Sequence, residues 1–129
     1  MQLKTLILTA IATLTITACT SAPKIPQIDA GVLQELQNIK DTGYNGENKA
    51  QLVKLNEKCS IEFTTRLQEG YLIEKWIFSG FKLYSAGAVT FLPNGLSEAQ
   101  KYDLHDAKVQ NQFLTMRDYF AKNAIEQCK

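Results

Sequence analysis

Alternating apolar and polar positions in the middle of the chain predict a set of β-strands. Ile61 and Phe63 alternate with polar neighbours, which is the pattern of a strand with one buried face. The segment 71–78 is dense in β-branched and aromatic residues, and Ser79-Gly80 is a two-residue turn signal before 81–92 resumes the pattern. We expect three or four antiparallel strands here, joined in sequence as a meander.

Helical spacing of apolar residues precedes this strand region. Asp29 is a suitable helix cap, and the apolar residues of 30–40 recur at three- and four-residue intervals, which favours a short helix. The segment 41–46 contains two glycines and an asparagine and favours a turn. A second helix is expected over 47–58.

A third helical pattern covers the C-terminal part of the chain. Ser97 and Gln100 form a capping-box pattern, and from Tyr102 onward apolar residues step by three or four without a proline or glycine. The expected core stripe of this helix is Val109, Phe113, Met116 and Phe120, and its expected solvent face is Lys108, Gln112, Thr115 and Lys122. The sequence therefore predicts an α+β fold with short N-terminal helices, a three- to four-strand antiparallel meander, and a long C-terminal helix packed on the sheet.

The N-terminal segment has the pattern of an export signal. A short basic region ending at Lys4 precedes an apolar run over 5–16, and small residues then lead to a cysteine. The sequence Ile16-Thr17-Ala18-Cys19 resembles the lipobox of bacterial lipoproteins. In that family the signal peptide is removed before the cysteine, which carries diacylglycerol and an acylated amine, so the resemblance implies a lipid on Cys19. A plain secretory signal fits less well, because its small-x-small site is only passable, and a transmembrane helix requires a longer apolar run.

This interpretation divides the chain into three parts. Residues 1–18 are the expected signal peptide, 19–30 a proline-containing lipidated tether, and 31–129 a single small globular domain. By the same resemblance, Thr20 in place of an aspartate after the cysteine implies delivery to the outer membrane, on its periplasmic side. We expect the protein to contact the membrane through its palmitate-like acyl chains.

The two other cysteines predict a disulfide. Cys59 and Cys128 are an even pair in a chain with an export signal, and thiols in an oxidising compartment usually pair. The chain-entropy model gives such a bridge a stabilisation of about 4 kcal/mol. No Cys-x-x-Cys motif occurs, so we expect a structural disulfide rather than a redox-active one.

The sequence carries no recognisable catalytic or metal-binding motif. The balance of 14 basic and 13 acidic side chains argues against electrostatic binding of nucleic acid. His105 is the only histidine and has no second ligand three or four residues away, so we expect no metal site and no cofactor. The acidic pairs Glu57 with Glu62 and Glu69 with Glu74 are interpreted as solvent-facing charge. We therefore predict a protein that is not an enzyme and has no catalytic residues.

Aromatic residues concentrate in the strand region, and apolar residues occupy both faces of the predicted sheet. Ile73 and Ile77 share one face, whereas Trp76 and Phe78 share the other. Either helices cover both faces or an apolar patch is left exposed for a partner. Candidate residues for that partner surface are Trp76, Phe78 and Tyr84.

The expected function is protein binding in the bacterial cell envelope. We predict a periplasm-facing outer-membrane lipoprotein that acts as an accessory or assembly factor by binding another envelope protein. Pilotins, which escort the secretins of type II secretion, are similar in size and in this predicted layout, by analogy of architecture only. The alternative is a lipoprotein that binds a small ligand or inhibits an envelope enzyme, with the loops 41–46 and 93–95 as contact candidates.

Overall fold

All strands in the described part of the chain, residues 31–129, belong to one six-stranded antiparallel sheet in the computed structural model. In chain order they are β1 (Val32–Gln37), β2 (Asn48–Lys54), β3 (Cys59–Arg66), β4 (Tyr71–Ser79), β5 (Lys82–Phe91) and β6 (Ser97–Lys101). Two short helices, α3 (Ala107–Asp118) and α4 (Lys122–Ile125), and a 3-10 turn, η2 (Glu126–Cys128), complete the chain. The predicted signal peptide, the tether and Cys19 lie outside the described residues.

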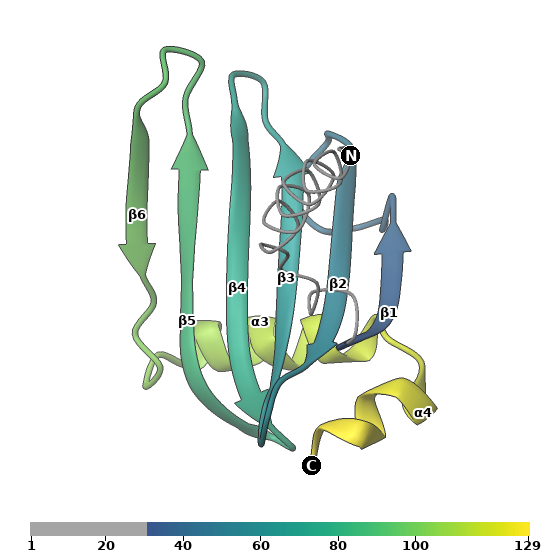
Figure 1. The fold of residues 1–129 in the computed structure, drawn as a ribbon. Coiled ribbons are helices and arrows are strands. Elements are labelled where there is room, and N and C mark those ends of the chain that lie inside the picture. The colour runs from purple at the N-terminus through teal and green to yellow at the C-terminus, as the bar shows by residue number, and fades with distance from the viewer. Residues whose placement is uncertain (1–30) are drawn as a thin grey trace, which may run out of the picture. The chain divides into compact units, whose positions relative to one another are not determined.

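Every strand lies beside its neighbour in the sequence, so the sheet is a continuous meander (Figure 1). Ser79 pairs with Lys82, which leaves Gly80 and Phe81 as the two-residue turn between β4 and β5. Gly80 has a φ of +61°, a left-handed conformation that glycine adopts without steric cost. A two-residue turn is therefore present as predicted, but one residue later than Ser79-Gly80, because Ser79 still belongs to β4.

The predicted α+β fold is wrong, first of all at the N-terminal side of the sheet. The segments expected as helices over 30–40 and 47–58 contain β1 and β2 instead. In β2, Ala50 and Leu52 are fully buried and alternate with Lys49 and Gln51, which is a period of two. The short apolar runs of this segment fit a helical spacing as well as a strand spacing. The segment is a strand because all seven residues of β2 pair with β3.

The predicted long C-terminal helix is also wrong. The residues of the capping-box pattern, Ser97 and Gln100, belong to β6, which pairs with β5. A helix begins only after Asp106, whose Oδ1 accepts a 2.8 Å hydrogen bond from the Lys108 amide. The first residues of the segment expected to be helical form β6, so α3 is a helix of only 12 residues. The analogy to pilotins was based on the predicted α+β layout, so it no longer applies.

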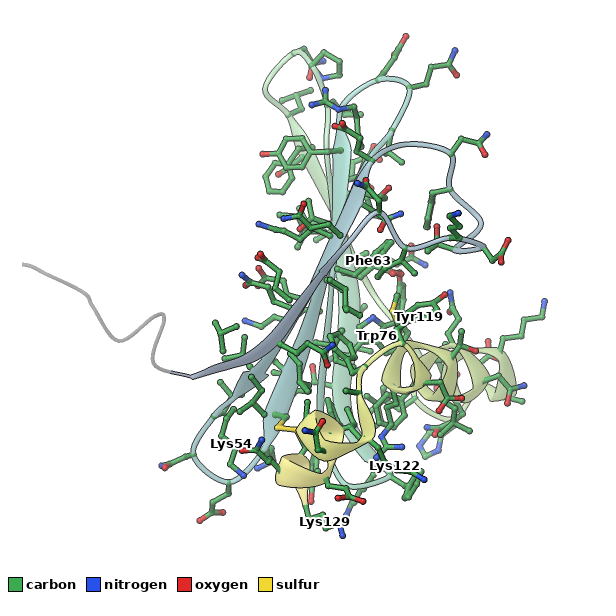
Figure 2. The ribbon with its side chains drawn as sticks, turned by 90° about the vertical axis from the view of Figure 1, so that its right-hand side faces the viewer. Lys54, Phe63, Trp76, Tyr119, Lys122 and Lys129 are labelled. Atoms are coloured by element: carbon green, nitrogen blue, oxygen red, sulfur yellow. A yellow bond between two sulfur atoms is a disulfide. The ribbon has the colours of Figure 1, made fainter. Side chains whose placement is uncertain are left out.

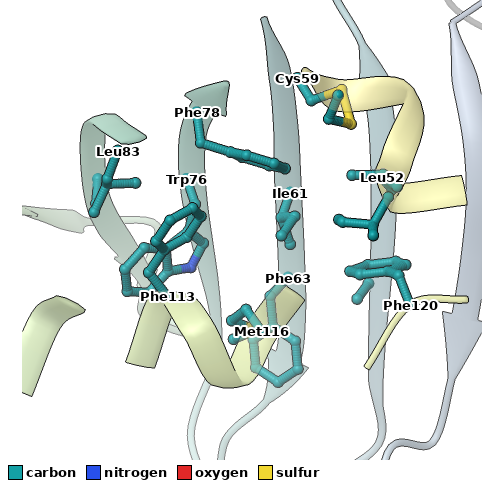
Figure 3. Close-up of a cluster of buried hydrophobic side chains, with 14 of the residues drawn as sticks. Leu52, Cys59, Ile61, Phe63, Trp76, Phe78, Leu83, Phe113, Met116 and Phe120 are labelled. Atoms are coloured by element: carbon teal, nitrogen blue, oxygen red, sulfur yellow. A yellow bond between two sulfur atoms is a disulfide. The ribbon is translucent and has the colours of Figure 1, made fainter. Parts of the chain in front are cut away.

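The hydrophobic core lies between α3 and one face of the sheet (Figure 3). Phe113 is fully buried and its ring lies 5.2 Å from that of Phe78 and 6.5 Å from that of Trp76. The predicted core stripe is confirmed, since all four residues, Val109, Phe113, Met116 and Phe120, are buried. The predicted solvent face is confirmed as well, since Lys108, Gln112, Thr115 and Lys122 are exposed.

Three bonds attach the C-terminus to one end of the sheet, at the β2–β3 and β4–β5 connections. Cys59 and Cys128 form the predicted disulfide, which spans 69 residues. The Gly80 amide donates a 2.6 Å hydrogen bond to the carbonyl oxygen of Cys128, and the Lys54 ammonium donates one to the carbonyl of Gln127. These contacts hold α4 and η2 against the ends of β2, β3 and the β4–β5 turn.

Candidate functional site

The two faces of the sheet differ in what covers them. Both C-terminal helices lie on one side, which we call the covered face, and no described element lies on the other, which we call the open face (Figure 2). On β4 the buried residues Leu72, Glu74, Trp76 and Phe78 belong to the covered face. The open-face residues of β4, β5 and β6 are Tyr71, Ile73, Lys75, Ile77, Ser85, Gly87, Val89, Phe91, Ser97, Ala99 and Lys101.

Cross-strand pairing arranges these open-face residues in rows across β4, β5 and β6. The first row contains Tyr71 and Phe91, whose rings stack with centroids 5.0 Å apart. The second row contains only aliphatic side chains, Ile73, Val89 and Ala99. These neighbouring rows form a continuous apolar strip, since side chains two residues apart on a strand share a face.

The third row is basic and contains a hollow. Lys75 and Lys101 both pair with Gly87, which therefore lies between two lysines. A Cβ atom on Gly87 would lie 2.7 Å from the backbone oxygen of Gln100, so the close approach of β5 and β6 requires glycine there. A shallow depression of about 530 Å³ lies over β4, β5 and β6 here, and Gly87 is among the residues that line it.

The charge on the open face changes from one half of the sheet to the other. On β1 and β2 an acid and a base neutralise each other, because Glu35 and Lys49 form a 3.7 Å ion pair. Glu62 on β3 pairs in register with Lys75. The open-face residues of β4, β5 and β6 include no carboxylate, so this half combines an apolar strip with a positive charge at Lys101.

A buried carboxyl group lies on the covered face, away from this surface. Glu74 is 2% exposed, and its Oε2 accepts a 2.5 Å hydrogen bond from the Tyr102 hydroxyl. Burial raises the pKa of the Glu74 carboxyl, and the hydrogen bond from Tyr102 opposes that rise. The bond joins β4 to the connection between β6 and α3, which is a structural contact, and it contradicts the interpretation of Glu74 as solvent-facing charge.

The residues predicted as a partner surface separate into two groups. Trp76 and Phe78 are fully buried against Phe113, so they are core residues and not a surface. Tyr84 is 44% exposed, and the ammonium groups of Lys58 and Lys82 lie 4.6 and 5.0 Å from its ring centre. Trp76 and Phe78 are buried because α3 covers their face of the sheet, whereas Tyr84 is not part of that core.

Sequence reasoning placed Ile73 and Ile77 opposite Trp76 and Phe78 but did not select Lys75, Val89 or Lys101 for the partner surface. The alternation that places Lys75 on the same face as Ile73 and Ile77 could be read from the sequence of β4. The row that joins Lys75 to Lys101 could not be read, because it requires the register of β5 and β6, and 97–101 was expected to be helical.

Other predicted site residues have simple surroundings. His105 is exposed, and its backbone amide donates a 2.9 Å hydrogen bond to Asp103 Oδ1. The loop 41–46 is closed at its base by Asn48, whose side chain bonds both the amide and the carbonyl of Ile39, at 2.7 and 2.9 Å. Its Tyr44 ring lies 6.2 Å from the ring of Phe63. The loop is thus packed onto the covered face.

A second hollow, of about 650 Å³, lies beside the β4–β5 turn and the C-terminus. Its wall includes Phe81, which is 72% exposed, together with Phe120 and Ile125. The Arg117 guanidinium lies 3.9 Å from the centre of the Phe81 ring, a cation–π contact that holds the exposed ring in place. This hollow combines an apolar wall with charged residues, in which the cationic Arg117, Lys122 and Lys129 outnumber the acidic Asp118 and Glu126.

Within residues 31–129, no group of three or more histidine, cysteine or acidic side chains is arranged to hold a metal ion. The helices of this part of the chain are all too short or too polar to span a membrane. Comparison with models of known protein families, with curated proteins and with solved structures finds no match.

Proposed function

We propose that the protein is a non-enzymatic lipoprotein of the bacterial envelope that binds another envelope protein through the open face of its sheet. The observation that carries this proposal is the apolar strip of Tyr71, Phe91, Ile73 and Val89, which no described element covers. A one-sided sheet normally presents polar side chains to solvent, and contiguous apolar surface on a small protein marks a binding site.

The lipid anchor is the second part of the proposal and rests on the motif Ile16-Thr17-Ala18-Cys19. Acyl chains on Cys19 hold the domain at the outer membrane, facing the periplasm, where it meets its partner. Cys19→Ala is expected to move the protein from the membrane to the soluble envelope fraction. Palmitate labelling that persists in this variant would contradict the lipid assignment.

Site-specific photo-crosslinking in living cells tests the binding face. A photoreactive residue at Val89 lies in the apolar strip, whereas one at Gln112 lies on the exposed side of α3 and serves as the matched control. We expect one discrete envelope protein to be crosslinked from Val89 and not from Gln112. Equal crosslinking from both positions, or from Gln112 alone, would refute the assignment of the open face.

A second candidate function is supported by the hollow beside Phe81. Its volume is within the range of small-molecule sites, and Arg117 and the apolar wall suit an amphipathic anion. Mass spectrometry of the protein extracted from cells tests this alternative. A stoichiometric ligand that is lost in Phe81→Ser would favour ligand binding over protein binding.

A further inference from the structure

The open face ends at an unpaired strand edge. β6 is the last strand of the sheet, and no described strand or helix lies along its outer side (Figure 1). Such an edge offers backbone N–H and C=O groups to an incoming strand. The edge is therefore a possible docking element adjoining the apolar strip.

Hydrogen bonds at both ends of β6 show which backbone groups are free. The Tyr102 amide donates to the Ala86 carbonyl, and the Leu96 carbonyl accepts from the Leu92 amide, both at 2.9 Å. Antiparallel bonding alternates from residue to residue, so even-numbered residues of β6 bond to β5. The N–H and C=O groups of Ser97, Ala99 and Lys101 therefore point away from the sheet.

The same three residues place their side chains on the open face, where each one ends a row. A strand added beside β6 extends the rows by one residue each. The residue beside Lys101 meets a positive charge that has no carboxylate in its row on β4, β5 or β6. The residue beside Ala99 reaches over this small side chain towards Val89, and the next one extends the row of Phe91.

We infer that an extended segment of the partner protein pairs with β6 as a seventh strand, with an acidic residue at Lys101 followed by apolar residues at Ala99 and Ser97. In antiparallel pairing this order reads acidic-x-apolar-x-apolar along the partner chain. The inference rests on the proposed function and specifies its mode as β-strand addition, in which main-chain bonds supply affinity and alternate side chains supply specificity. The basic row selects an acidic segment over a second copy of this chain, whose open face carries the same positive charge.

Peptide binding to the full-length lipoprotein, purified in detergent, tests the inference directly. The probe is a fluorescent peptide whose central five residues are glutamate, threonine, isoleucine, threonine and phenylalanine, and fluorescence anisotropy reports its binding. N-methylation of the amides that face β6 is expected to abolish binding, because it removes the donors. N-methylation of the other amides of the same peptide is the matched control and is expected to leave binding unchanged.

Two protein variants separate the backbone and charge contributions. Ala99→Pro removes an outward N–H that β5 does not use, and proline is tolerated at such edge positions, so we expect roughly tenfold weaker binding by a folded protein. Lys101→Glu is expected to weaken binding by about three- to tenfold, and a peptide with lysine in place of glutamate restores it. Lys108→Glu, on the exposed side of α3, has the same charge change and is expected to have no effect.

Binding that is insensitive to backbone N-methylation and to Ala99→Pro would overturn strand addition. Protein dimers that Ala99→Pro dissolves, without peptide binding, would assign the edge to a second copy and overturn the inference as well. The proposed function fails differently, since it requires crosslinking from Val89 in cells. Crosslinking from Val89 that is retained in Ala99→Pro would keep the open face as the binding site and reject β6 as its docking edge.

Discussion

Replacing Phe113 by alanine removes the side chain through which α3 packs on the sheet. Phe113 is fully buried, and its ring contacts Trp76 and Phe78 on β4 while the Arg117 guanidinium lies 6.0 Å from its centre (Figure 3). The cost combines lost transfer free energy with the cavity left behind, which together amount to about 3 to 5 kcal/mol for a phenylalanine. Because sheet residues held by backbone pairing cannot collapse into the space, we expect a value near the upper end.

Urea unfolding of the purified, disulfide-bonded chain, followed by tryptophan fluorescence, measures this loss through the single tryptophan, Trp76. A loss of about 5 kcal/mol is a large part of the roughly 5 to 15 kcal/mol that stabilises a domain. Gln112→Ala on the same helix is exposed, and we expect it to change the unfolding free energy by less than about 0.5 kcal/mol. A loss below about 1 kcal/mol in Phe113→Ala would refute the packing of α3 on the covered face.

Two further predictions concern the disulfide and the buried carboxyl. Removing the disulfide by Cys59→Ala together with Cys128→Ala is expected to lower the unfolding free energy by about 4 kcal/mol, because the bridge restricts a 69-residue loop in the unfolded chain. Chemical denaturation measures this loss, and a change below about 1 kcal/mol would contradict the prediction. The raised pKa of Glu74 means that the folded state favours the protonated carboxyl, so its contribution to stability is present at low pH and is lost as pH rises through the folded pKa. Relative to Glu74→Gln, the wild type is therefore expected to lose stability as the pH rises above the ordinary carboxyl pKa of about 4, and parallel pH profiles for the two proteins would contradict this.

The sequence was informative where burial follows a strict local period. The alternation of Ile61 and Phe63, the turn at Gly80, and the three-to-four spacing of the α3 stripe were all readable, because each of these segments buries one face only. Cys59 and Cys128 were predictable for another reason, since an export signal and an even number of cysteines restrict the pairing.

Strands β1, β2 and β6 were not predicted from the sequence. In β2 the apolar residues Ala50, Leu52, Val53 and Leu55 fit a helical spacing as well as a strand, and β1 and β6 are the edges of the sheet. The β1 residues Leu33 and Leu36 are only half-buried, and the residues of β6 are all exposed, so neither strand carries a clear alternation. Their conformation is set by pairing with β2 and β5, which is a long-range effect that local propensity does not contain. The basic row on the open face was missed for the same reason, because the register that aligns Lys75, Gly87 and Lys101 depends on β6 being a strand.

The claim that the open face binds the partner is tested most directly by a pull-down. The full-length lipoprotein, with a charge introduced into the apolar strip, is used to recover the partner from cell envelopes. Val89→Lys changes the middle of that strip, and Gln112→Lys introduces the same residue on the exposed side of α3. We predict that Val89→Lys recovers at least about tenfold less of the protein that crosslinks from Val89, as expected when a charge is desolvated at an interface. Gln112→Lys is predicted to recover the wild-type amount. Undiminished recovery by a folded Val89→Lys protein would contradict the open face as the binding surface.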